Sequence, residues 1–390
     1  MNIIYVNWDC FGAEDAVEAL NNLGHKIYIT QMTEEAHVRL DEDFMEKLSM
    51  LIDTQNANLV FTFNYFPSVS EVCQKKGCRY LAWMYDNPYT KLYDKSVANE
   101  CNYVAAFDSW LEEHMKVKGI NTVHYVPLAV NTRRMKKLII TEEDRKRFTS
   151  DISFLGSLYN EAHNFYDRLI GKSKDEELQG YLDGIMLAQR KMWGCNFLID
   201  CLTKEVVEKI DKYLPYKVEE GSYISKEEVY GDYYLARRLA YIERVELLEY
   251  LGSYFSVVHY TPNKDTKLRN VENRGCLHYF EEMPKAFRLS KININTTLRS
   301  IRNGIPLRAM DILGAGGFLM SNYQSDLLKH FEPEKHFTCY SSIEEAADKA
   351  NYYLHHEVER RKIVENALHV IEQEHTYEVR FEKLLKEVFI

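Results

Sequence analysis

Apolar and polar positions alternate along the first 131 residues in the rhythm of short strands and amphipathic helices. Short apolar runs predict strands, and stretches of helical periodicity between them predict helices, of which the first ends at Gly24 and the third at Gly77. Predicted strands lie at 2–8, 26–30, 58–64, 79–86, 102–108 and 123–131, and predicted helices at 13–25, 41–55, 68–77 and 109–119. Alternation of this kind is typical of a parallel sheet with helices on both faces.

The pattern restarts near residue 150, after a charged stretch, with a strand that runs into a glycine turn at 152–161. Residues 161–250 show helical periodicity with few strand signals, and strands return at 255–261, 291–296, 316–322 and 337–340 before closing helices at 342–373 and 376–389. We therefore expect an N-terminal α/β domain (1–150), a second α/β domain (151–375) enlarged by the helical segment 161–250, and a C-terminal helix (376–390) that packs back on the first domain.

Composition narrows the class of protein. A chain of 390 residues is longer than one core usually supports, which agrees with two domains. The formal net charge of −10 argues against a nucleic-acid or anionic-membrane partner. The first residues read as a strand rather than a signal peptide, no apolar run reaches the ~18 residues of a membrane helix, and the eight cysteines include no C-x-x-C pair. These features predict a cytoplasmic protein with reduced thiols.

Residues 299–321, RSIRNGIPLRAMDILGAGGFLMS, combine charge with glycine in an unusual way. Pro306 suits the first turn of a helix, and the free N–H groups of that turn, beside Arg302 and Arg308, predict an anion site. Asp311 lies three residues beyond Arg308, on the same helix face, where a carboxylate can accept hydrogen bonds from a sugar or ribose diol. The alternative is an ordinary strand-to-helix turn with a surface Arg–Asp pair.

The chain resembles the GT-B glycosyltransferases, and most closely their spore-maturation (CgeB-like) branch. The resemblance rests on SWLEEHMKVKGINTVHYVPLAVN, DISFLGSLYNE, the long segment from GCLHYF (275–280) to NYYL (351–354), and HTYEVR, in that order. It implies an α/β fold with two Rossmann-like domains that face a central cleft, with a helical segment inserted in the second. Donor-binding loops are then expected at the carboxyl ends of the strands.

The resemblance also implies roles for individual residues. Many retaining members carry two glutamates separated by seven residues; Asn303 and Asp311 stand at these positions, so Asp311 is expected on the nucleotide ribose, while Asn303 brings no charge to the sugar. Gly156 and Ser157 are expected near the diphosphate. The basic pair that usually follows that loop is absent, and Arg299, Arg302, Arg308 and Lys291 are the candidate substitutes. Residues 275–280 are expected beside the nucleobase, and the remaining predicted donor-binding residues are Tyr260, Thr261, Leu277, Tyr279, Asn295 and Gly304.

No cofactor or metal is expected, because cations and helix dipoles of the protein stabilise the leaving diphosphate in GT-B enzymes. The donor substrate is expected to be a nucleotide-diphosphate sugar, with UDP as the nucleotide. The one D-x-D sequence, Asp41–Glu42–Asp43, is read as a solvated helix face, and His355–His356 as surface residues of a helix rather than metal ligands.

The acceptor side is expected in the N-terminal domain. The stretch AWMYDNPY places Trp83, Tyr85, Asp86, Asn87 and Tyr89 at the end of a predicted strand. Asp86 is the candidate general base, although Asp-Asn-Pro is also a common turn, and Asp9 is the second candidate.

The sequence thus predicts a metal-independent glycosyltransferase of the hexosyltransferase type that uses a nucleotide sugar. Its acceptor (protein, glycan or small molecule) and its stereochemical outcome stay open. The alternatives are a nucleotide-sugar epimerase, for which the predicted donor site holds few carboxylates, and a catalytically silent nucleotide-sugar-binding protein.

Overall fold

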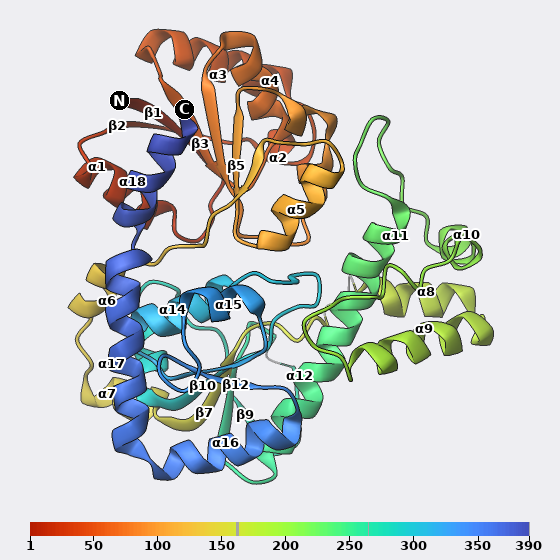
Figure 1. The fold of residues 1–390 in the computed structure, drawn as a ribbon, viewed down its shortest axis with the longest axis vertical. Helices are drawn as coiled ribbons and strands as arrows, with labels where there is room; N and C mark the ends of the chain where they lie inside the picture. The colour runs from red at the N-terminus through yellow and green to blue at the C-terminus, as the bar shows by residue number, and fades with distance from the viewer. Residues whose placement is uncertain (161–163, 264, 390) are drawn as a thin grey trace. The chain divides into compact units, whose positions relative to one another are not determined.

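The computed structural model describes residues 1–160, 164–263 and 265–389 and shows two compact units (Figure 1). Unit 1 comprises residues 1–131, 219–224 and 373–390, and unit 2 comprises residues 132–218 and 225–372. Each unit contains one six-stranded sheet in which all recorded strand pairs are parallel. The predicted fold class, two Rossmann-like α/β domains with a helical segment in the second, is confirmed.

The sheet of unit 1 has the strand order β2-β1-β3-β4-β5-β6. Its strands are β1 (Asn2–Asn7), β2 (Lys26–Gln31), β3 (Leu59–Phe63), β4 (Arg79–Trp83), β5 (Asn102–Ala106) and β6 (Val123–Tyr125). Its helices are α1 (Ala13–Asn22), α2 (Glu34–Val38), α3 (Glu42–Gln55), α4 (Pro67–Lys76), α5 (Ser109–Val117) and α18 (Tyr377–Val388), with 3₁₀ turns at Thr90–Tyr93 and Lys95–Ala98. The last predicted strand is shorter than expected, since only 123–125 of 123–131 pair in the sheet.

The sheet of unit 2 has the order β12-β11-β10-β7-β8-β9. Its strands are β7 (Ser150–Leu155), β8 (Val257–Tyr260), β9 (Val271–Asn273), β10 (Ser290–Asn295), β11 (Leu319–Asn322) and β12 (Thr338–Tyr340). The helices before β8 are α6 (Thr132–Lys137), α7 (Glu142–Phe148), α8 (Phe165–Ser173), α9 (Glu176–Gln189), α10 (Lys204–Tyr213), α11 (Lys226–Val229), the π-helical turn Tyr230–Leu235 and α12 (Ala236–Gly252). Those after it are α13 (Met283–Leu289), α14 (Leu307–Ala315), α15 (Ser325–His330), α16 (Ile343–His355) and α17 (Glu357–Glu374).

Local chemistry explains where these helices begin and end. Side chains of Asp, Ser or Thr cap many of them, and Thr141 and Asp144 form a complete capping box at α7. Helix α14 ends at Gly316, whose φ of 79° is a left-handed conformation that glycine adopts readily. Gly317 follows in a crowded place, because a Cβ there would lie 2.9 Å from Asn293 Nδ2 and 3.0 Å from the Phe287 carbonyl oxygen. Gly316 and Gly317 therefore allow a tight passage from α14 to β11.

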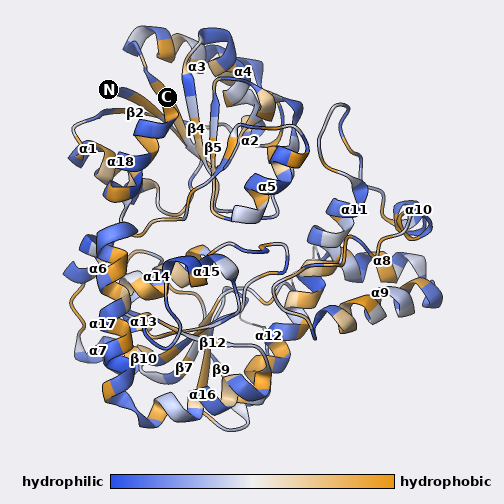
Figure 2. Ribbon diagram, in the orientation of Figure 1, coloured by the Kyte–Doolittle hydropathy of each residue, from blue (hydrophilic) through white to orange (hydrophobic). Residues whose placement is uncertain are grey.

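The core of unit 2 lies between the sheet and helices α12 and α16. Residues of β7, β8 and β10 pack there with Leu247, Leu248 and Leu251 of α12 and with Ala346 and Ala350 of α16. Figure 2 shows the corresponding alternation of hydrophobic and hydrophilic residues along α16 and α17. Helix α12 continues from the group formed by α8, α9 and α10 onto the sheet of unit 2 (Figure 1).

The C-terminal helix α18 packs within unit 1. The ring of Phe381 lies 5.4 Å from that of Phe61 on β3 and 5.3 Å from that of Trp83 on β4. Arg79 Nε donates a hydrogen bond of 2.7 Å to the Val388 carbonyl.

The units divide between residues 131 and 132, not near the expected residue 150. Helices α6 and α7 join unit 2 because Arg288 donates hydrogen bonds to the carbonyls of Met135 and Leu138, and Lys285 pairs with Asp144 at 2.9 Å. Residues 219–224, within the predicted helical segment, instead pack with unit 1, where Tyr223 N donates to the Tyr93 carbonyl at 2.8 Å.

Two further expectations can be compared with the structure. All eight cysteines are free thiols, and four of them are buried. Among the described residues, no helix combines the length and apolarity that crossing a bilayer requires.

Candidate functional site

Asp311 occupies the middle of α14, which follows β10 and its long loop 296–306. Its side chain is only 2% exposed. Tyr279, in the loop before α13, donates a hydrogen bond from its hydroxyl to Asp311 Oδ1 at 3.0 Å. The hydrogen bond holds a buried carboxylate in one orientation at the end of the sheet where nucleotides bind in doubly wound folds.

Arg308 lies one turn before Asp311 and approaches its Oδ2 to 3.8 Å, as the three-residue spacing predicts. Its guanidinium also contacts the Met283 sulfur and lies 5.8 Å from the centre of the Phe287 ring. Burial lowers the pKa of Arg308 and the Asp311 carboxylate raises it, but an arginine stays protonated at neutral pH. The side chain is 28% exposed, so a charged group remains accessible beside the buried carboxylate.

A second arginine lies near Tyr279. The Arg134 guanidinium of α6 lies 4.8 Å from the ring centre of Phe280 and 6.0 Å from that of Tyr279, and its Nη1 donates to the Phe280 carbonyl at 2.9 Å. These contacts hold the 275–280 loop, for which a place beside the nucleobase stays a prediction from the family resemblance.

The loop after β7 holds Gly156 and Ser157, the two predicted diphosphate residues. Gly156 has a φ of 157°, a backbone conformation that only glycine adopts without strain. Its N–H donates to the Tyr260 carbonyl at 3.1 Å, and its own carbonyl accepts from His259 Nε2 at 2.8 Å. Burial lowers the pKa of His259, which favours the neutral imidazole that donates this hydrogen bond. Residues of neighbouring β8 thus hold the backbone of Gly156 through both its N–H and its carbonyl.

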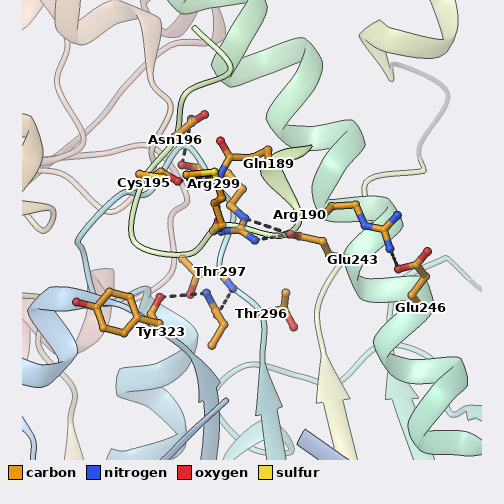
Figure 3. A network of polar contacts seen from close by, with 12 residues as sticks. Gln189, Arg190, Cys195, Asn196, Glu243, Glu246, Thr296, Thr297, Arg299 and Tyr323 are labelled. Atoms are coloured by element: carbon orange, nitrogen blue, oxygen red, sulfur yellow. Dashed lines mark hydrogen bonds and ion pairs between the residues drawn. The ribbon is translucent and has the colours of Figure 1, made fainter. Parts of the chain in front are cut away.

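Arg244 of α12 was not predicted from the sequence, yet it joins two of the loops. One of its terminal nitrogens donates to the Ser157 carbonyl, and the other donates to the Thr296 carbonyl at 2.8 Å. Its neighbour Glu243 binds Arg299, with Arg299 Nη2 at 2.6 Å from Glu243 Oε1 (Figure 3). The sequence hardly indicates the positions of Glu243 and Arg244, because charged residues are common in an amphipathic helix.

Arg299 was predicted as a phosphate ligand, but the structure places it inside the network of Figure 3. Its side chain is 5% exposed, its Nη1 donates to the Met192 carbonyl at 3.0 Å, and its guanidinium lies 3.8 Å from the centre of the Trp193 ring. Burial raises the pKa of Glu243 and Arg299 opposes this, with a bidentate geometry typical of an ion pair. This placement argues against direct phosphate contact by Arg299.

Two other predicted donor residues have partners within the protein. Lys291 lies near the amino end of β10, the edge opposite to the loops, where it pairs with Asp151 at 2.7 Å. Asn295 is 4% exposed, and its amide donates to Thr297 Oγ1 and Ser321 Oγ, so it fastens β10 to β11. Both are polar residues of a strand that leads to the predicted donor site. Their partners Asp151 and Ser321 lie elsewhere in the chain, so no local pattern indicates these contacts.

The remaining predicted donor residues border the same loops of unit 2. Arg302 Nη1 donates a hydrogen bond of 3.4 Å to the Asn196 carbonyl. The Asn303 carbonyl accepts a hydrogen bond of 3.0 Å from Asp326 N, and Gly304 is buried. Thr261 N donates to the Gly275 carbonyl at 2.9 Å, which joins the loop after β8 to the 275–280 loop. Tyr260 is 2% exposed and Leu277 packs against it. Their roles toward a ligand stay predictions.

In unit 1, Asp86 follows β4 and is held by Asn64, which follows the neighbouring β3. Asn64 Nδ2 donates to Asp86 Oδ2 at 2.7 Å, and Asn64 Oδ1 accepts from the backbone N–H of Asp86 at 3.2 Å. The Asp-Asn-Pro sequence therefore forms an ordered turn at the carboxyl edge of the sheet. Such a turn is compatible with either role of Asp86, a base or a structural residue.

Asp9 lies at the same edge, after β1, with a left-handed φ of 59°. It accepts a hydrogen bond of 3.0 Å from Gln31 Nε2. The neighbouring Trp8 stacks on Tyr85 at 5.9 Å, so the loops after β1 and β4 are in contact. The two predicted catalytic carboxylates thus belong to one cluster of loops in unit 1.

The two sequences considered as metal sites have structural explanations. Asp41 is buried, caps α3 by accepting from Phe44 N at 3.2 Å, and also accepts from Thr33, so the expectation of a solvated face is wrong for this residue. His355 and His356 are exposed, and each contacts a backbone carbonyl four residues earlier.

The sequence from residue 237 to 386 matches a family model described as glycosyl transferase-like. No curated protein matches the chain at a significant level. Among solved structures, a glycosyltransferase from Rickettsia africae is 12% identical over 99% of this chain and 97% of its own, with a TM-score of 0.54.

HepE from Anabaena, solved with UDP and glucose, is 7% identical over 100% of this chain and 99% of its own, with a TM-score of 0.54. A sucrose-phosphate synthase from Thermosynechococcus elongatus is 9% identical, with coverages of 100% and 99% and a TM-score of 0.57. At these identities the likeness concerns the fold, which is that of the GT-B glycosyltransferases.

Proposed function

We propose that this chain is a glycosyltransferase of the hexosyltransferase type that takes its sugar from a UDP-sugar without a metal ion. The observation that carries the proposal is the arrangement of Asp311, Tyr279 and Arg308 in unit 2 of a GT-B fold. A buried carboxylate that is oriented by a tyrosine can accept hydrogen bonds from the hydroxyls of a ribose. The partly exposed arginine beside it can donate hydrogen bonds to a phosphate. The likeness of HepE, solved with UDP and glucose, supports the choice of nucleotide.

The proposal also names a branch of the GT-B glycosyltransferases. We assign the chain to the spore-maturation (CgeB-like) branch on the sequence segments given above. Arg302 and Arg308, together with the backbone of the 156–157 loop, are the groups that would take up the charge of the leaving diphosphate in place of a metal. The acceptor would bind at unit 1, with Asp86 or Asp9 as base.

Calorimetry with UDP and UDP-glucose, with and without a chelator, tests the donor site. A charge-assisted hydrogen bond contributes about 1.5–3 kcal/mol, so Asp311→Asn should weaken UDP binding roughly 10- to 100-fold. Tyr279→Phe removes only the hydrogen bond that orients Asp311 and should cost less, about 2- to 10-fold. The matched control is Glu365→Gln, which removes an exposed carboxylate of α17 in the same unit.

Several outcomes would contradict the proposal. Wild-type protein that binds no UDP, Asp311→Asn protein with wild-type affinity, or affinity that disappears with the chelator would each count against the donor site. Slow release of UDP from UDP-glucose without acceptor is the first activity assay. Conversion of the sugar at C2 would favour an epimerase, and binding without any turnover would favour a silent binding protein.

A further inference from the structure

Arg244 carries a positive charge in the interior of unit 2. Arg244 lies at the middle of α12 (Ala236–Gly252) and is 8% exposed. Its two terminal nitrogens donate to the carbonyls of Ser157 and Thr296, which belong to the loops after β7 and β10. The guanidinium therefore lies at the junction of the two loops that border the predicted diphosphate position.

Carbonyl dipoles and aromatic rings are the recorded surroundings of the Arg244 guanidinium. Among the residues that the structure describes, Arg244 takes part in no ion pair, and its Nε has no hydrogen-bond partner. The nearest acid along the helix, Glu243, is bound by Arg299. Tyr159 and Phe154 present rings whose centres lie 4.6 and 5.4 Å from the Arg244 guanidinium carbon. Buried charges are ordinarily paired, so this cation is incompletely compensated.

A second cation is directed to the same region. Arg308, at the start of α14, is close enough to Arg244 for the two positive charges to disfavour each other. Burial, and after it the charge of Arg244, lower the pKa of His259, whose Nε2 contacts the Gly156 carbonyl. Positive charge thus gathers beside the described start of the loop after β7, residues 156–160, which contains no lysine or arginine.

We propose that Arg244 provides the buried positive charge that the diphosphate of a bound nucleotide neutralises. The inference rests on the proposed function and deepens it, because it assigns the role of the missing basic pair to a residue of the helical segment. Arg244 acts as a positioning residue as well, since its fork holds the Ser157 and Thr296 carbonyls. A multiply charged anion beside it gains Coulomb energy that a neutral nucleoside does not gain.

The test compares uridine, UMP and UDP by calorimetry on wild-type protein, Arg244→Met and Arg244→Lys. Methionine keeps the length of the side chain without charge, and lysine keeps the charge without the fork. In Arg244→Met, the ratio of uridine to UDP dissociation constants should fall at least tenfold from its wild-type value. In Arg244→Lys most of that ratio should remain. Arg238→Met is the control, because Arg238 lies on the same helix and pairs with Asp167 at 3.4 Å.

A purely structural role predicts a different result. Loss of the loop contacts would weaken uridine and UDP equally in both Arg244 variants, and that outcome would overturn the proposal. Should Arg244→Met fail to fold, Tyr159→Glu supplies an internal counter-charge next to Arg244, with Tyr159→Gln as its neutral match. The uridine-to-UDP ratio should then be lower in Tyr159→Glu than in Tyr159→Gln, and equal ratios would overturn the inference.

The two proposals fail separately. Wild-type protein that binds none of the three ligands would refute the donor site and the inference together. Wild-type protein that binds UDP tightly, with a ratio unaffected by Arg244→Met, would refute the role of Arg244 and leave the proposed function standing.

Discussion

The Glu243–Arg299 ion pair offers a stability experiment whose size follows from the structure. The two side chains are 9% and 5% exposed and are joined by hydrogen bonds of 2.6 and 3.2 Å. Glu243→Gln removes the negative charge and leaves the Arg299 guanidinium buried without a carboxylate. Breaking such a pair on one side costs about 3–5 kcal/mol.

Because glutamine keeps one oxygen as an acceptor, we expect the lower end of that range. A loss of 3 kcal/mol in a domain of this size lowers the midpoint of thermal unfolding by about 6–12 °C. Scanning calorimetry measures this shift directly. Glu246→Gln on the same helix is the matched control: Glu246 is 41% exposed and pairs with Arg190, and exposed pairs contribute at most about 1 kcal/mol.

A double variant separates loss of the pair from loss of packing. Glu243→Leu combined with Arg299→Met removes both charges, and apolar replacement of a buried ion pair is often neutral. The double variant should therefore recover most of the stability that Glu243→Gln loses. Equal midpoints for Glu243→Gln and Glu246→Gln would refute the reasoning, because they would show that the Glu243 carboxylate contributes no more than an exposed one.

Three other changes have defined outcomes. Burial lowers the pKa of His259 in the native protein, so the unfolded chain binds the proton first as the pH falls below about 6.5. Urea unfolding should therefore show a loss of stability between pH 7.5 and 5.5, and His259→Gln should reduce that loss. An unchanged loss in the variant would exclude His259 as its source. Gly317→Ala places a Cβ 2.9 Å from Asn293 Nδ2 and 3.0 Å from a carbonyl oxygen, and should cost about 1–3 kcal/mol in the same unfolding assay, whereas a wild-type midpoint would mean that the backbone yields easily. Asp86→Asn should lower donor turnover about 10²- to 10⁴-fold with UDP affinity in unit 2 preserved; loss of both would mark the turn as structural, and unchanged turnover would shift the role to Asp9 or to the leaving phosphate.

The features that the sequence predicted well depend on neighbouring residues. Pro306 and Gly316 bound α14 closely, and the three-residue spacing brings Arg308 to Asp311. The alternating strands and helices of both units follow from periodicity in the same way. Strand β9 was not predicted, because its sequence VEN contains one apolar residue and no apolar run.

The features that the sequence missed depend on distant partners. Arg299 finds Glu243 56 positions away, and Arg244 finds the Ser157 carbonyl 87 positions away, so no local pattern indicates either contact. The boundary between the units was misplaced for a similar reason. Helices α6 and α7 precede the first strand of unit 2, and their contacts with α14 and α13, distant in the sequence, place them in it.

The pair Glu243 and Arg244 connects the helical segment to the loops that follow β7 and β10 of unit 2. Successive residues of a helix point about 100° apart, so one side chain of the pair can reach the 296–299 loop while the next reaches the loop after β7. Helix α12 therefore fixes Arg299, Thr296 and Ser157 with two adjacent side chains. The same helix packs into the core through Leu247, Leu248 and Leu251. The loops are therefore held in position relative to the sheet. It follows that substitutions at Glu243 should change the geometry of both loops, and that UDP affinity should fall in Glu243→Gln but not in Glu246→Gln.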